Sequence, residues 1–228
     1  MSEKIQEAVA LRTCLREPIP EIAYAARLLD DAVSSHLRGD VDEAAQLISL
    51  ANIPAIREWS ESLWGRNSPY VKVHFTTQSL LRLRRDRQTL NRMPTSGERR
   101  ELHLRDGYHC RFCGIPVIRR QVRIDIAKAY PISLPWGREN STQHAAFQAM
   151  WAQYDHLLPH SKGGTNGLDN VVVTCAPCNF GRMNYTLKEV GLLNSLSSQL
   201  FHRLWNISVC EIAQVRPKQI EPGCEKAD

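Results

Sequence analysis

The chain has 228 residues, of which 43% are hydrophobic and 23% are charged, and its formal net charge is +5. This length allows one large domain or two small ones, and the composition is ordinary for a soluble globular protein. The N-terminus mixes both signs of charge, and no apolar run approaches the roughly 20 residues that a membrane span needs, so we expect a cytoplasmic protein with no membrane segment.

The charges are distributed unevenly along the chain. Residues 1–77 hold 8 basic and 11 acidic side chains (net −3), and residues 78–125 hold 12 and 5 (net +7). Residues 126–228 hold the remaining 9 and 8 (net +1). The middle segment is therefore the candidate anion-binding surface.

Residues 1–66 are predicted to be helical. Apolar side chains recur at helical spacing, and residues 21–38 form a strongly amphipathic segment followed by Gly39, which suits a C-cap. A second helix is predicted over residues 40–51, with Asp40 as its cap. A third begins near Pro54, because Pro is favoured in the first turn of a helix.

The role of this acidic N-terminal region, residues 1–78, is not indicated by its sequence. A small helical bundle is the simplest interpretation, and the bundle could bind a partner protein or mediate self-association. Residues 67–78 are predicted to be a linker or a short strand.

An arginine-rich stretch follows. Residues 79–95 are predicted to be a basic linker or helix, and a further helix is predicted from Ser96 to about Arg105. All twelve basic residues between positions 78 and 125 are Arg, whose planar fork donates two parallel hydrogen bonds to phosphate. A solvated helix face would explain the same charges equally well. The candidates for contact with nucleic acid in this segment are Arg99, Arg100 and Arg105.

Four of the seven cysteines form two Cys-x-x-Cys pairs, Cys110 with Cys113 and Cys175 with Cys178. In a chain without an evident secretion signal, such pairs favour metal ligation over disulfide formation. A structural zinc ion takes four ligands in a tetrahedron. The two pairs together therefore predict one structural zinc site.

Residues 115–153 separate the first Cys pair from the second. Residues 115–126 alternate between apolar and polar side chains, which favours a strand or hairpin. Residues 139–153 are predicted to form a helix capped near Asn140 or Ser141. Two aromatic residues of this helix are assigned to the core and one histidine to its exposed face: Phe147, Trp151 and His144.

The densest group of chemically active residues comes next. Residues 152–158 and 170–174 are predicted to be antiparallel strands joined by a glycine-rich loop. Pro177 lies where a helix could start. The pattern predicts a strand–loop–strand–helix unit in which His156 faces the helix that carries Asn179.

These residue types suit phosphodiester hydrolysis, which needs a base for water, a divalent cation and basic groups that hold the backbone. His156 suits the base, because its unperturbed pKa lies near working pH. Asp155 and Asn179 offer oxygen ligands for Mg²⁺ or Mn²⁺. Asn170, beside Asp169, can order the loop through side-chain to backbone hydrogen bonds. The candidates for phosphate contact here are Arg182 and Lys162.

The order of these motifs resembles the HNH endonuclease family over about residues 96–185. The resemblance implies a ββα-metal fold with a zinc site made of four cysteines. It implies that His156 is the general base, that Asp155 and Asn179 are metal ligands, and that Asn170 orders the loop and the base. His160 is a further candidate ligand, although its side chain could equally face solvent. Asn in place of the last His makes this an H-N-N variant, and the 41 residues between Cys113 and Asp155 form an unusually long insertion for the family.

The sequence thus predicts an α+β, mostly helical protein. An N-terminal helical region would precede an HNH nuclease domain over residues 96–210, with an insertion at 115–153 and a C-terminal helix, and residues 211–228 would be a disordered tail. The expected function is metal-dependent cleavage of DNA, with RNA a second possible substrate. Two alternatives remain open: a zinc-stabilised nucleic-acid-binding protein that does not cleave, and a nuclease effector that a partner protein activates.

Overall fold

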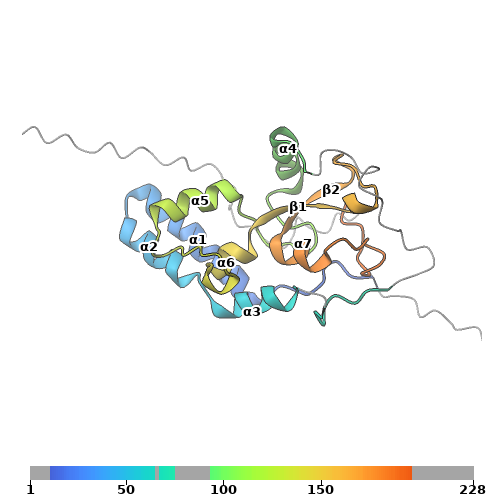
Figure 1. Cartoon of the computed structure of the whole chain (residues 1–228). Coiled ribbons are helices and arrows are strands. Elements are labelled where there is room, and N and C mark those ends of the chain that lie inside the picture. The colour runs from blue at the N-terminus through green and yellow to red at the C-terminus, as the bar shows by residue number, and fades with distance from the viewer. Residues whose placement is uncertain (1–10, 65–66, 75–92, 197–228) are drawn as a thin grey trace, which may run out of the picture.

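The computed structural model describes residues 11–64, 67–74 and 93–196. This part of the chain is mostly helical, with one two-stranded antiparallel sheet, so the α+β prediction is confirmed (Figure 1). None of the described helices has the length and apolar character needed to cross a bilayer. In chain order the elements are α1 (Pro20–Arg38), α2 (Val41–Leu50), α3 (Pro54–Ser62), α4 (Ser96–Asp106), α5 (Arg120–Ala129), the 3-10 helix η2 (Asn140–Thr142), α6 (Ala145–Ala149), β1 (Ala152–His156), the 3-10 helix η3 (His160–Lys162), β2 (Val171–Cys175) and α7 (Ala176–Arg182).

The first three helices lie where the sequence predicts them. Gly39 follows α1 with a φ of 92°, a left-handed conformation that Gly adopts without the steric cost of a Cβ. Pro54 occupies the first turn of α3. Asp40 precedes α2 but makes no side-chain capping hydrogen bond, because its carboxylate accepts from Arg38 instead.

Several predictions fall outside the described residues. These are the helical spacing in residues 1–10, most of the arginine-rich stretch, and the C-terminal helix and tail beyond residue 196. Residues 67–74, which are described, contain turns and no strand.

The prediction of a strand or hairpin over residues 115–126 is wrong, because the second half of this segment belongs to helix α5. The alternation that suggested a strand coexists with helical spacing: Val122, Ile126 and Ala129 share one face. All three line an apolar space against α1. Burial of that face favours the helical period over the alternating one.

Helix α6 is shorter than predicted, and His144 precedes it rather than lying on an exposed face. The ring of His144 is completely buried, and its Nε2 lies 2.8 Å from the backbone oxygen of Ile48 at the end of α2. The backbone N–H of Ala145 donates to the side chain of Asn52 at 2.8 Å. These contacts fasten the insertion to the N-terminal helices. Phe147 is buried as predicted, and Trp151 is half-buried.

The predicted hairpin is present, with Asp155 paired to Val172 in an antiparallel register. Successive side chains of a strand point to opposite faces. Tyr154 therefore contacts His103 of α4 on one face, while Asp155 contacts Arg182 of α7 on the other. The hairpin is held between α4 and α7 (Figure 1).

The C-terminal helix that is expected for the nuclease domain does not begin within residues 186–196, which form turns. The two hydrogen bonds of a capping box are nevertheless present. The N–H of Thr186 donates to the Glu189 carboxylate at 2.7 Å, and the N–H of Glu189 donates to the Thr186 hydroxyl at 3.2 Å. Gly191 then adopts a φ of 65°, which ends the turn.

Burial of His144 is expected to make stability depend on pH. Burial lowers the pKa of His144 to about 4, although its hydrogen bond to the Ile48 carbonyl opposes the shift. The unfolded chain, with a histidine pKa of about 6.5, binds a proton between these values and the folded chain does not, so stability is complete above about pH 6.5 and falls toward pH 4. His144→Gln retains a donor and cannot titrate. Its urea-unfolding free energy should fall less than that of the wild type between about pH 7 and pH 5. Equal losses would contradict the assignment.

Candidate metal centre and active site

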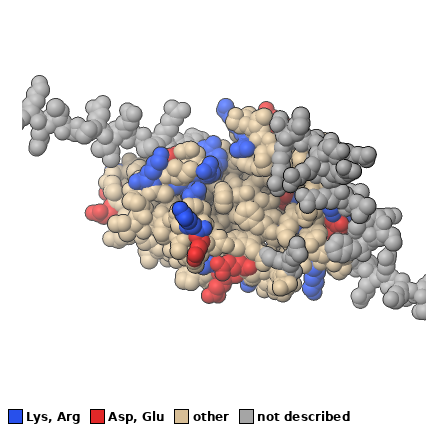
Figure 2. Space-filling view, in the orientation of Figure 1, with Lys and Arg blue, Asp and Glu red and all other residues tan. Residues whose placement is uncertain are grey.

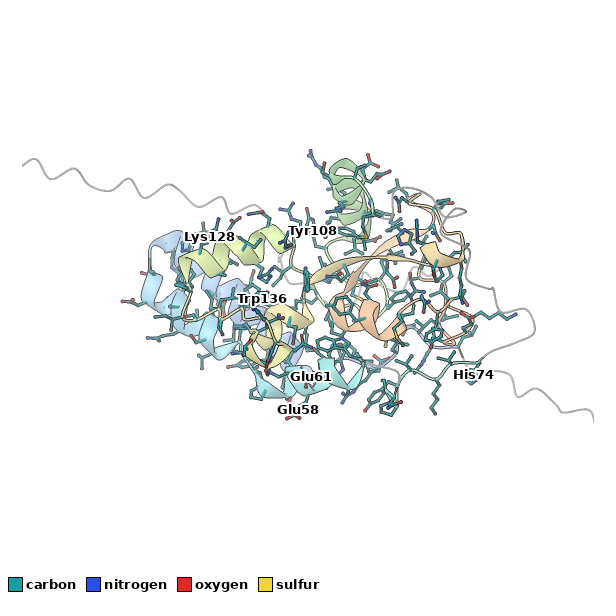
Figure 3. All side chains as sticks on the ribbon, viewed as in Figure 1. Glu58, Glu61, His74, Tyr108, Lys128 and Trp136 are labelled. Carbon is teal, nitrogen blue, oxygen red and sulfur yellow. The ribbon has the colours of Figure 1, made fainter. Side chains whose placement is uncertain are left out.

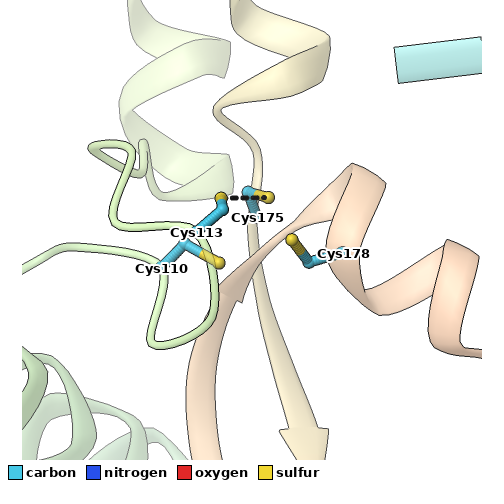
Figure 4. Close-up of side chains that lie close together, drawn as sticks. All are labelled: Cys110, Cys113, Cys175 and Cys178. Atoms are coloured by element: carbon cyan, nitrogen blue, oxygen red, sulfur yellow. Dashed lines mark hydrogen bonds between the residues drawn. The ribbon is translucent and has the colours of Figure 1, made fainter. Parts of the chain in front are cut away.

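The four cysteines of the two pairs converge at one point (Figure 4). Their Sγ atoms all lie within 4.8 Å of one another, and those of Cys113 and Cys175 are 3.6 Å apart. Three elements bring them together. Cys110 and Cys113 lie on a turn closed by the Gly114 N–H, which donates to the Cys110 carbonyl at 2.8 Å. Cys175 ends β2, and Cys178 lies in the first turns of α7.

This arrangement fits a zinc ion. With Zn–S bonds of about 2.3 Å, the edges of a ligand tetrahedron are about 3.8 Å long, close to the separation of Cys113 and Cys175. Burial opposes ionisation of Cys110, but hydrogen bonds from the other three thiols lower its pKa below the usual value. Four buried cysteine sulfurs form a soft donor set, which suits zinc. The four cysteines could therefore hold a structural metal ion.

In the part of the chain that the structure describes, no second group of three or more His, Cys, Asp or Glu side chains has its donor atoms so close together. Asp155, His156 and His160 therefore do not form a cluster of that kind. The predicted hard-metal site differs in this respect from the thiol site.

Asp155 is held by Arg182. The Arg182 Nε donates to one carboxylate oxygen at 2.7 Å, and a terminal nitrogen donates to the other. The same guanidinium also donates to the backbone oxygens of His156, at 2.6 Å, and of Tyr185. Burial raises the pKa of Asp155, and Arg182 opposes the rise. Both oxygens of the predicted metal ligand are thus engaged.

The prediction that Arg182 binds phosphate is wrong for this structure. Only 1% of Arg182 is exposed, and its donors are directed at protein oxygens. Lys162 is likewise removed from solvent, because its side chain is 8% exposed and forms an ion pair with Glu189 at 2.5 Å. Both residues act here as links between elements.

His156 ends β1, and its ring contacts the connecting loop rather than α7. Its Nε2 lies 2.8 Å from the side-chain oxygen of Asn166, and its ring centroid is 5.9 Å from that of His160. The expectation that His156 faces the helix is therefore wrong, and it is Asp155 that reaches α7. Burial lowers the pKa of His156, with Asn166 opposing. The lowered pKa favours the neutral imidazole, the form that accepts a proton.

Asn170 orders the loop as the sequence suggests. Its side chain accepts from the Leu158 N–H at 2.8 Å and donates to the carbonyls of Leu158, at 3.2 Å, and Thr165, at 2.8 Å. Gly164 lies beneath this amide, where a Cβ would come within 1.8 Å of the Leu158 carbonyl oxygen. The loop that carries Asn166 is therefore fixed at both ends.

The remaining candidates have different surroundings. Asn179 is half-buried on α7, and its side chain makes no hydrogen bond to the described residues. Arg105 donates to both oxygens of Asp106, at 2.7 and 2.8 Å, and to two backbone carbonyls. Arg99 lies over the ring of Tyr154, 5.1 Å from its centroid. Arg100 is exposed.

Sequence reasoning missed two side chains that support the site. Asn166 holds His156, yet its sequence context, Thr-Asn-Gly, indicates only a turn. Glu189 pairs with Lys162 across 27 positions, and no local pattern reveals such a contact.

Comparisons of the chain with protein-family models, with curated proteins and with solved structures found no match. The resemblance to HNH endonucleases therefore rests on the motif residues themselves.

The thiol site should hold about one zinc ion per chain after dialysis. Cys175→Ser leaves three thiolates, so the variant should lose most of its zinc and unfold at a lower temperature. Cys14→Ser is the control, because Cys14 is also buried but bonds to Glu17 outside the cluster. Elemental analysis and thermal unfolding provide the two readouts. Wild-type zinc content in Cys175→Ser would refute the site.

Arg182→Met should destabilise the protein by about 3–5 kcal/mol, because it leaves the Asp155 carboxylate buried without its partner. Removing both charges in Arg182→Met/Asp155→Leu should recover part of that loss. Arg100→Met, an exposed control, should change stability by no more than about 0.5 kcal/mol. Denaturant unfolding measures all three variants. An unfolding free energy of Arg182→Met equal to that of the wild type would show that the pair does not form.

Proposed function

We propose that the protein is an HNH-type endonuclease that hydrolyses phosphodiester bonds in DNA, with His156 as the general base. The observation that carries the proposal is the setting of His156. His156, whose pKa is lowered by burial, ends β1, Asn166 holds its ring, and Asn170 fixes the loop around it.

The thiol cluster supports the proposal through its position. It joins the turn after α4, the end of β2 and the start of α7, as the resemblance to the HNH family implies for a structural zinc. The strand–loop–strand–helix order is the second supporting feature. A binding scaffold alone would not need a histidine whose pKa is lowered and whose ring is held by an amide.

In this proposal His156 accepts a proton from the attacking water. Asn166, through its side-chain oxygen, fixes the ring when the Nε2 atom carries the proton, which leaves Nδ1 as the acceptor. The Arg182 bond to the His156 carbonyl holds the backbone at the same point. Ring and backbone are thus both positioned before substrate arrives.

A bound Mg²⁺ or Mn²⁺ would take up charge on the scissile phosphate. The donor set for such an ion does not fit this structure fully, because Arg182 occupies both oxygens of Asp155. The Asn179 amide makes no hydrogen bond to the residues that the structure describes, and His160 lies beside His156. Arg182 would have to release Asp155 before that carboxylate could act as a ligand.

The same pair favours the second candidate function, a zinc-stabilised nucleic-acid-binding protein without cleavage. A permanently closed Asp155–Arg182 pair would leave the fold intact and the hard-metal site incomplete. If a partner protein opens the pair, the protein is instead an activated effector, with the N-terminal helices as the candidate docking region. A DNA-nicking assay separates these outcomes.

Purified protein should nick supercoiled plasmid DNA with Mg²⁺ or Mn²⁺ and lose this activity with a chelator. His156→Ala should lower the rate by about 10²–10⁴-fold, the usual effect of losing a general base. His74→Ala is the matched control, because His74 is exposed and distant along the chain; Figure 3 labels it.

Nicking that persists unchanged in His156→Ala would refute the assigned base. Wild-type protein that binds DNA without nicking it under any of these conditions would favour the binding protein or the effector. An RNA substrate in the same assay tests the choice of nucleic acid.

A further inference from the structure

We infer that the edge of the molecule formed by α4 and α5 is the surface on which the phosphate backbone of duplex DNA lies. The inference rests on the proposed function and adds a binding surface to it. We define the basic edge by three exposed cations: Arg100 on α4, and Arg120 and Lys128 on α5. Arg120 belongs to the basic segment 78–125, but the sequence indicated neither Arg120 nor Lys128 as a contact, because it predicted no helix there.

The three cations of the basic edge are available to a ligand. Within the described residues none of them makes an ion pair or a side-chain hydrogen bond. Figure 2 shows Lys and Arg side chains along α5 and on α4, on the same edge of the molecule. Figure 3 labels Lys128 on this edge, and Glu58 and Glu61 of α3 on the opposite one. Glu101 on α4 and Asp125 on α5 lie on the same helices, so the positive excess of this edge comes mainly from α5. A polyanion is attracted there more than to the edge that carries Glu58 and Glu61.

Two more arginines connect the basic edge to the hairpin. Arg99 of α4 lies 5.1 Å from the ring centroid of Tyr154. Burial raises the pKa of Tyr154, while the charges of Arg99 and of Arg119, just before α5, oppose that rise. Both arginines are therefore near the same side chain of β1. Arg99 and Arg119 are half-buried, so they bring positive charge close to Tyr154 without being fully exposed.

This surface leads to the proposed base. Tyr154 and His156 are two residues apart on β1, so they share a face and lie about 7 Å apart along the strand. That face is packed against α4 at Tyr154, and His156, which is 7% exposed, ends the strand. A backbone bound at the basic edge would therefore approach the end of β1 that carries His156.

The start of α5 would gain from a bound anion. Arg119 and Arg120 occupy its N-terminal end, its first turn contains no acidic residue, and no side chain caps it. The helix dipole is positive there, so the exposed cation of Arg120 at this end is unfavourable until an anion binds. The charge pattern therefore suits a ligand better than it suits the isolated helix.

The aromatic rings near the basic edge favour contacts with a duplex backbone over stacking on single-stranded bases. Arg99 lies over Tyr154, and His103 contacts the same ring edge-on at a centroid distance of 5.7 Å. Tyr108 is stacked on His103 at 4.8 Å. Single-strand binding relies on rings with an uncovered face, whereas a duplex presents its phosphates outward. We therefore assign duplex DNA as the ligand.

The test measures binding without cleavage. The full-length His156→Ala protein is titrated against a fluorescent DNA duplex at several salt concentrations, alone and with Arg100→Ala, Arg120→Ala or Lys128→Ala added. Each added change should weaken binding and reduce the slope of log K against log salt by about 0.9, the value for one lost phosphate contact. Lys72→Ala is the matched control, because it removes an exposed cation elsewhere and should leave the slope unchanged.

The outcomes distinguish the two proposals. Variants of the basic edge that bind with the slope of the control would overturn the basic edge and leave the nuclease proposal standing. Tighter binding to a single strand of the same sequence would overturn the assignment of a duplex. No DNA binding by the wild type, together with no nicking, would overturn the proposed function and with it this inference.

Discussion

The convergence of four cysteine thiols is the constraint on which the site depends. A hairpin of two five-residue strands is at best marginally stable by itself. The cysteines join the turn after α4, the end of β2 and the start of α7, and Cys113 and Cys175 are 62 residues apart along the chain. A metal ion bound by these thiols would stabilise only the folded chain, so its binding energy would add to folding stability.

The Asp155–Arg182 pair fastens the other end of α7. The thiols hold the first turn of this seven-residue helix, and Arg182, its last residue, reaches across to β1. A helix that short gains little stability from its own hydrogen bonds. The position of α7 is therefore determined by two side-chain contacts, the cysteine cluster at its start and the Asp155–Arg182 ion pair at its end. The Asp155–Arg182 pair also engages the carboxylate that a nuclease would use to bind a metal ion. Asp155 therefore has a structural contact and a proposed catalytic role at the same time.

The sequence predicts best those features that depend on local spacing. Two Cys-x-x-Cys pairs, the hairpin, the Pro at the start of α3 and the Gly after α1 all carry a signal within a few residues. The failures concern partners distant along the chain. The Ile48 carbonyl bonds to the ring of His144 across 96 positions, and no pattern near His144 distinguishes a buried ring from an exposed one. The α5 segment has apolar residues at both helical and alternating spacing. Packing against the apolar surface of α1 favours the helix.

The same limit applies to predicting a binding surface from the charged residues of the sequence. The twelve arginines between residues 78 and 125 mark a candidate anion-binding region, but their number does not say which of them are available. Arg105 is used by Asp106, and Arg123 lies 3.6 Å from the ring centroid of Trp136. Net charge counts such side chains fully, although their donors or faces already have partners. A binding surface is defined by the cations that remain after these internal contacts are made, and tertiary structure alone determines which ones remain.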